Sequence, residues 1–156
     1  MEFQLVKPSF ELLFQARVTP ESAVYVSKVP SGERHFIPVT GGSFEGEKLS
    51  GDVLPGGADW QLMRPDDSVF LHARYALRTN DNVPIYVENN GIRSGSSEVL
   101  AQLARDEAVD RSEYYFCTTP QFETGATQYS WLNNIIAVCS GVRLVNAAII
   151  DFYSVL

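Results

Sequence analysis

The chain has 156 residues, enough for one domain with a sizeable core, and 45% of them are hydrophobic. Its formal net charge is −7 and it has no basic run, which argues against nucleic acid as a partner because nucleic-acid-binding proteins neutralise phosphates with basic stripes. An apolar stretch of about 18 residues and a secretory signal pattern are also missing, so we expect no membrane partner and a cytoplasmic location.

The first half of the chain predicts short β-strands separated by turns. Apolar and polar residues alternate with a period of two through residues 10–19, which is typical of a half-buried strand. Gly46 and Gly51 indicate bulges or tight bends of the kind that barrels need. Further strand-like segments in this half cover residues 24–29, 35–40, 43–54 and 58–64.

The second half predicts longer strands and one helix. Residues 69–79 form the longest alternating run, a return strand follows at 83–88, and Asn90-Gly91 is expected to mark its turn or bulge. Leucines at helical spacing after a serine predict a helix over 96–105. The remaining segments are strands at 114–124, 134–142 and 146–155, with a short helical turn at 129–133.

These elements predict an all-β fold. We expect a closed or nearly closed antiparallel β-barrel of about 8–10 strands with one short α-helix, which forms a single domain over residues 1–156. Closure would remove the exposed strand edges. The nine Phe, seven Tyr and two Trp are more large rings than a small core needs, and they suit a pocket for a small organic ligand.

The segment Gly56-Gly57-Ala58-Asp59-Trp60-Gln61 is the richest candidate for chemistry. Two glycines let the backbone pass close to a ligand, and strand alternation places Asp59 and Gln61 on one face. An inward Asp59 would be a catalytic acid or base whose pKa is tuned by a dry interior. The alternative is that Asp59 caps a turn or pairs with an arginine.

His72 and Arg74 lie two residues apart on one strand and therefore share a face. If that face lines the lumen, His72 can shuttle protons and Arg74 can hold a carboxylate, phenolate or enolate oxygen. The alternative is an ordinary solvated strand face. We predict Asp59, His72 and Arg74 as the catalytic group.

Rings and hydroxyls of the segment 114–124 are typical of a ligand cavity, although aromatic stripes also form simple cores. Neighbouring elements can add further rings. The predicted substrate-binding residues are Trp60, Gln61, Tyr86, Tyr115, Phe116, Cys117, Thr119, Glu123 and Trp131.

Several mechanisms lack a sequence signal. The two histidines, His35 and His72, have no metal-ligand spacing, so no metal is expected. Nucleophile-elbow, phosphate-loop and Rossmann patterns are missing, so no cofactor is expected. The two cysteines, Cys117 and Cys139, are too few for a disulfide framework and are predicted to be buried free thiols.

Five segments carry a family resemblance, in order and with similar spacing from about residue 10 to the C-terminus. They are Val53-Leu-Pro-Gly-Gly-Ala-Asp-Trp-Gln61, Ala73-Arg-Tyr-Ala-Leu-Arg-Thr79, Ile85-Tyr-Val-Glu-Asn-Asn-Gly-Ile92, Tyr115-Phe-Cys-Thr-Thr-Pro-Gln-Phe-Glu-Thr124 and Tyr129-Ser-Trp-Leu-Asn133. With these segments the chain resembles the domain of unknown function 3237 family. The resemblance implies a lipocalin-like antiparallel barrel with an open mouth, but no reaction.

The resemblance also marks individual positions. Those that fit its motifs are Asp59, Trp60, Gln61, Arg74, Tyr86 and Glu123. One departure is Cys117, where the family pattern carries arginine. If that arginine grips an anion, the departure implies a less charged ligand for this chain.

Three functions remain open at this stage. The first is a cofactor-free isomerase, cyclase or lyase that acts on an apolar or aromatic metabolite inside the barrel, as a member specialised for one biosynthetic substrate in secondary metabolism. The second is a non-catalytic binding or carrier protein that uses the same pocket. The third is an interaction module whose barrel is fully packed. The sequence leaves a homodimer open.

Overall fold

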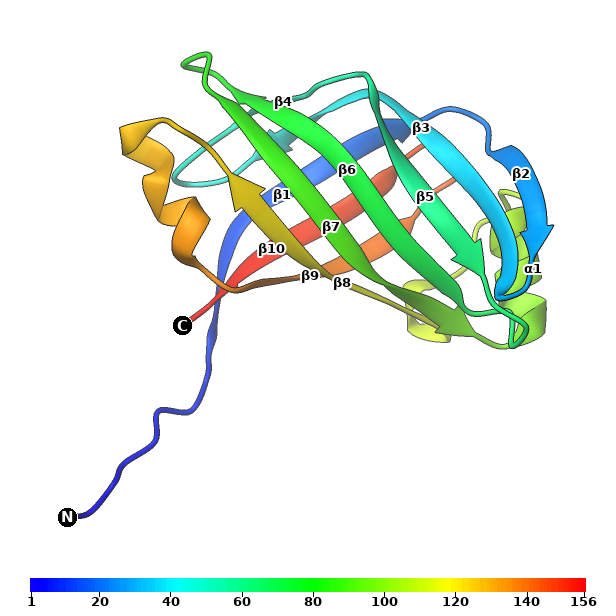
Figure 1. The fold of residues 1–156 in the computed structure, drawn as a ribbon, viewed down its shortest axis with the longest axis horizontal. Coiled ribbons are helices and arrows are strands. Elements are labelled where there is room, and N and C mark those ends of the chain that lie inside the picture. The colour runs from blue at the N-terminus through cyan, green and yellow to red at the C-terminus, as the bar shows by residue number, and fades with distance from the viewer.

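The structure is a computed structural model that describes all residues 1–156. It is mostly sheet, with one α-helix and two short 3-10 helices (Figure 1). In chain order the elements are β1 (Phe10–Pro20), β2 (Val24–Val29), β3 (Gly32–Glu45), β4 (Gly51–Val53), β5 (Gly57–Met63), β6 (Val69–Thr79), β7 (Pro84–Gly95), α1 (Ser97–Ala104), η1 (Arg111–Glu113), β8 (Tyr114–Glu123), η2 (Thr127–Asn134), β9 (Ala137–Arg143) and β10 (Ala148–Val155).

The strands close into an antiparallel barrel, as the sequence predicts. β1 pairs with β10 on one side and with β3 on the other, and this double pairing closes the sheet. β4 and β5 share one position in the wall between β3 and β6, and β2 pairs only with β3. The wall therefore has eight strand positions and two extra short strands. None of the helices has the length and apolar character that a membrane crossing requires.

The two ends of the barrel differ. The half near η2 is filled by apolar side chains, with Phe14 stacked on Phe152 at 4.4 Å between ring centroids. The opposite end is covered by α1, which buries Leu100 and Leu103 against the first residues of β6 and β8 (Figure 1). Ser96 caps this helix through its hydroxyl, as predicted.

One predicted turn is wrong. Asn90-Gly91 does not interrupt the chain, because β7 continues through it and pairs with β8 from Tyr86↔Glu123 to Gly95↔Tyr114. Gly91 is needed there for close approach: a Cβ atom on it would lie 2.2 Å from the carbonyl oxygen of Cys117. The predicted segment 43–54 is also two strands, β3 and β4, rather than one. Both cysteines are free, but only Cys139 is buried, while Cys117 is half-buried.

The seam between β8 and β9 has few paired residues for strands of this length. Only Cys117↔Ser140 and Thr118↔Cys139 pair across it. Beyond these pairs the Arg111 guanidinium donates to three backbone carbonyls, those of Gly141, Tyr114 and Phe116. A side chain therefore satisfies acceptors that the sheet ladder leaves open.

We expect Arg111→Ala to lower the free energy of unfolding by about 3 kcal/mol, because three buried or half-buried acceptors lose a charged donor. Amide hydrogen exchange in β8 and β9 should accelerate more than in β6 and β7. The exposed Arg105, which contacts only Glu107, supplies the control variant Arg105→Ala. Equal stabilities of the two variants would contradict this role of Arg111.

Candidate functional site

The end of the barrel covered by α1 is hollow. A cavity of about 560 Å³ lies in this half of the lumen. Val18, Val39, Tyr75 and Ile150 belong both to the packed core and to the cavity lining, so they form its floor. Exposed residues of the segments 20–23, 104–106 and 144–147 form the mouth. The volume lies within the ordinary range of small-molecule sites, so the barrel is not a fully packed module.

Asp59 lies on the wall of this cavity with both carboxylate oxygens held. Gln61 Nε2 donates to Oδ2 at 2.6 Å, and the backbone N–H of His72 donates to Oδ1 at 2.9 Å. The β5–β6 pairing is interrupted between Asp59↔Ala73 and Leu62↔Phe70, and the Asp59 side chain accepts a backbone hydrogen bond inside this gap. The carboxyl group is therefore built into the sheet.

A second contact holds Gln61 in one orientation. His35 Nε2 donates to Gln61 Oε1 at 2.7 Å, so the amide nitrogen of Gln61 is directed at Asp59. Gln61 is only 2% exposed. His35, Gln61 and Asp59 thus form a hydrogen-bonded row along facing positions of β3 and β5.

Burial raises the pKa of Asp59 above its ordinary value. Desolvation of the charged form outweighs the opposing effects of the Gln61 hydrogen bond, the Arg93 charge and the His72 N–H. Asp59 is therefore a carboxyl group that holds its proton at higher pH than an exposed aspartate. Such a group can donate or accept a proton in a dry cavity.

Other polar atoms in the cavity wall lack a well-formed hydrogen bond, although Tyr75 lies near Asn89 and Thr118 lies near Cys139. Tyr75 Oη, Asn89 Oδ1, Thr118 Oγ1 and Arg93 Nε are all buried and make no hydrogen bond of good geometry. All four residues line the cavity. Buried polar groups in folded proteins are nearly always paired, so this concentration of unpaired groups marks a place where another molecule can supply the partners.

The structure divides the predicted site residues into separate groups. Asp59, Gln61 and Phe116 line the lumen. His72 contributes its backbone N–H to Asp59, but its ring lies on the outer wall beside Phe70, with 6.0 Å between the ring centroids. Strand alternation explains the split, since Leu71 and Ala73 take the inward positions beside it.

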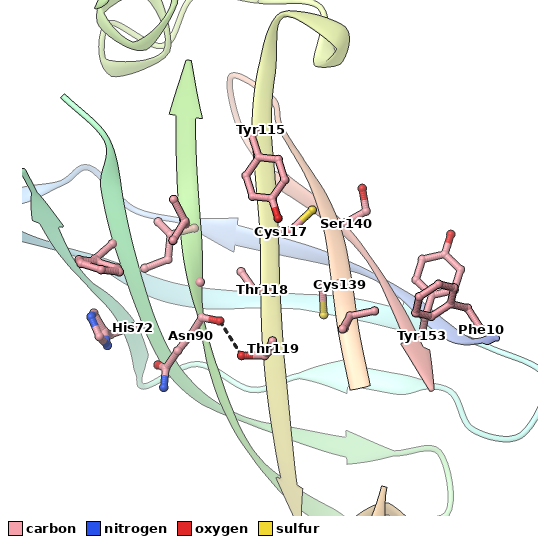
Figure 2. Close-up of a pocket in the computed structure, with 15 residues that line it drawn as sticks. Phe10, His72, Asn90, Tyr115, Cys117, Thr118, Thr119, Cys139, Ser140 and Tyr153 are labelled. Atoms are coloured by element: carbon pink, nitrogen blue, oxygen red, sulfur yellow. Dashed lines mark hydrogen bonds between the residues drawn. The ribbon is translucent and has the colours of Figure 1, made fainter. Parts of the chain in front are cut away.

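His72, Tyr115, Cys117 and Thr119 meet in an outer groove across β6 to β10, with a volume of about 680 Å³ (Figure 2). Thr119 Oγ1 donates there to the carbonyl of Asn90 at 3.3 Å. The groove is open to solvent, and its polar side chains can be solvated. The Cys117 position therefore does not determine the charge of a ligand in the lumen.

The remaining predicted residues contact neither cavity. Arg74 is 61% exposed and pairs with Glu88 at 3.2 Å on the outer wall. Trp60 stacks outside on Phe36, and Tyr86 and Glu123 are exposed. Trp131 packs against the core at the η2 end, under the Lys48 ammonium. The structure thus does not bring Arg74 to Asp59.

The sequence analysis missed Tyr75, Asn89, Arg93 and the contact of His35. Alternation along β7 could have indicated that Arg93 is buried. The buried residues of this strand all have odd numbers: Ile85, Val87, Asn89 and Arg93. The turn predicted at Asn90-Gly91 ended the expected strand before Arg93, so the alternation was not followed that far. Groups of three or more His, Cys, Asp or Glu side chains arranged to hold a metal ion are not found.

The family assignment follows from comparison with known proteins. The sequence model described as "Protein of unknown function (DUF3237)" matches residues 8–155. The chain belongs to the DUF3237 family. A UPF0311 protein of Rhodopseudomonas palustris is 45% identical over 129 residues, which cover 83% of this chain and 84% of the relative.

Solved structures share the DUF3237 barrel. A conserved protein of unknown function from Rhodopseudomonas palustris superposes with a TM-score of 0.94 at 39% identity, and the match covers 97% of this chain and 100% of the other. An enzyme from Penicillium herquei has a TM-score of 0.74 at 19% identity, with 100% of both chains covered. At that identity the likeness concerns the fold alone.

The Asp59 carboxyl of this DUF3237 barrel should leave a pH signature in stability. The folded protein holds the Asp59 proton to higher pH than the unfolded chain, so its contribution to the free energy of unfolding is full in acid and declines as pH rises through the raised pKa. We expect the stability of Asp59→Asn relative to the wild type to increase from about pH 4 to about pH 8 in urea titrations. Asp52→Asn, at an exposed position, is the control. A relative stability that falls over this range would contradict the burial of Asp59.

The Tyr75 hydroxyl should lower the stability of the ligand-free protein. Its buried hydroxyl lies near Asn89 but makes no hydrogen bond of good geometry, so Tyr75→Phe should raise the free energy of unfolding by about 1 kcal/mol in the ligand-free protein. The exposed Tyr25→Phe should leave it unchanged, as urea titration can measure. A loss of stability in Tyr75→Phe alone would show that the hydroxyl already has a partner.

Proposed function

We propose that the barrel lumen binds a small apolar or aromatic metabolite and catalyses a cofactor-free isomerisation, cyclisation or lyase reaction on it. The observation that carries the proposal is Asp59, a half-buried carboxyl group with a raised pKa on the wall of a cavity that has both apolar and polar lining. A carboxyl group with a raised pKa is a better proton donor at a given pH than an exposed aspartate, and its ionised form is a stronger base.

The surroundings of Asp59 support a catalytic role. The Gln61 and His72 hydrogen bonds hold the carboxyl group in place before the substrate arrives, so little reorganisation is needed during proton transfer. Tyr75, Asn89 and Thr118 add unpaired groups that can orient the substrate. His72 acts through its backbone in this proposal, and Arg74 is too exposed to participate.

The Penicillium herquei neighbour, described as an enzyme, is compatible with this proposal because the same type of barrel supports catalysis there. Fold likeness at 19% identity transfers no reaction, so the assignment rests on the residues of the lumen.

A carrier function is the second candidate. The aliphatic floor and wall of the cavity, including Val18, Ile37 and Val39, suit simple retention of an apolar molecule. Native mass spectrometry of the freshly purified protein distinguishes the two functions. A carrier releases its bound molecule chemically unaltered, whereas an enzyme converts it.

The catalytic proposal is tested by incubating the protein with a small-molecule extract of its host cells and following changed compounds by mass spectrometry. We expect Asp59→Asn to slow the conversion at least about tenfold, equivalent to about 1.4 kcal/mol of activation free energy. Ala73→Trp, which places a large ring in the lumen opposite Asp59, should also slow the conversion, and the exposed Asp52→Asn should not change it. Full turnover in Asp59→Asn would exclude Asp59 from the mechanism.

A further inference from the structure

The cavity contains a buried cation that the proposed proton chemistry does not use. We propose that Arg93 forms an anion subsite in the lumen, so that the molecule bound there carries an ionised oxygen, such as a carboxylate, phenolate or enolate. This inference rests on the proposed function, because it names the substrate class of the same cavity.

Arg93 has no partner in the protein that would explain its burial. Its residue is 6% exposed, its Nε atom makes no hydrogen bond, and it forms no salt bridge. The guanidinium carbon of Arg93 lies 5.7 Å from the centroid of the Phe116 ring, which supplies no hydrogen-bond acceptor oxygen. Burial of an unpaired charge is costly, so an anion that enters the lumen gains a strong and unused partner.

The charged neighbours of Arg93 do not neutralise it. Arg143 adds a second positive charge and is itself paired with Asp106 at 2.9 Å. Asp59 lies near enough to influence Arg93 but forms no salt bridge with it, and burial favours its neutral form. Desolvation and the Arg143 charge lower the pKa of Arg93 to about 10, so the guanidinium remains charged at neutral pH.

Arg111 has a structural role in this barrel and provides a comparison for Arg93. Arg111 donates to the backbone carbonyls of Tyr114, Phe116 and Gly141. Arg93 lies on the adjacent strand, opposite Phe116, and has none of these acceptors. The contrast indicates that Arg93 is kept available for a molecule from outside the chain.

The surroundings of Arg93 define the shape of that molecule. The planar guanidinium fork matches two oxygens of a carboxylate or one concentrated oxygen charge. Asn89 and Thr118 offer additional polar atoms on the same wall, while Ile37 and Leu71 supply apolar surface for the body of the ligand. An amphipathic molecule with one anionic end fits this arrangement.

Two fluorescent probes with the same rings test the subsite. Anilinonaphthalene sulfonate carries an anionic group, and the corresponding N-phenylnaphthylamine is neutral. We expect the wild-type protein to bind the anionic probe at least about tenfold more tightly than the neutral one. Arg93→Met should remove this preference while keeping the neutral probe bound, and Arg93→Lys should retain part of it.

Two further variants show where on the protein the probes bind. Arg78→Met removes an exposed arginine from the outer wall and should preserve the preference of the wild type. Ala73→Trp places a large ring in the lumen and should weaken binding of both probes, because neither is expected to bind in the outer groove. Circular dichroism confirms that each variant is folded, and Arg93→Gln replaces Arg93→Met if the latter does not fold.

The outcomes separate the subsite from the proposed function. Equal affinity of the wild type for both probes, or a preference that survives in Arg93→Met, overturns the anion subsite but leaves lumen binding intact. Failure of both probes to bind the wild type, or affinities for both probes that are unchanged in Ala73→Trp, overturns lumen binding itself.

Discussion

Closure of the sheet through β1 is the constraint on which the other features of this protein depend. Because β1 pairs with both β10 and β3, the first and last strands of the sheet leave no open edge between them. The inward side chains of eight strand positions then surround one lumen. The fold can leave part of that lumen hollow, since the other half, around Phe14 and Phe152, supplies a dense apolar core.

The packed half of the barrel supplies most of the apolar core, and the hollow half contains the polar groups of the candidate site. Polar groups in the hollow half, such as Tyr75, Asn89 and Arg93, are buried with fewer partners than a stable core would provide. Such groups reduce stability, and the cost is offset by the core at the η2 end. The sparsely paired seam between β8 and β9, held by Arg111, lies in the wall of the same hollow half.

Much of the fold could be predicted from alternation alone. The strand at residues 69–79 has the predicted bounds because it alternates with an unbroken period of two, and the strand at 24–29 has them because turns enclose a short apolar run. The site was harder to predict, because alternation groups His72 with Arg74 without saying which face is inward. Arg93 was not predicted as a lumen residue because Asn-Gly usually marks a turn. In this structure Gly91 instead allows β7 to approach β8 closely. Which faces meet in the lumen depends on closure, a tertiary property that no single segment contains.

The central claim is that the hollow half of the barrel receives a small molecule. A crystal of the protein soaked with a brominated naphthol tests this claim directly, since anomalous scattering from bromine locates the ligand unambiguously. We predict a bromine site inside the lumen, with the naphthol oxygen near Arg93 or Asp59. Bromine found only in the outer groove beside Tyr115 and Cys117, with the lumen filled by side chains, would contradict the account.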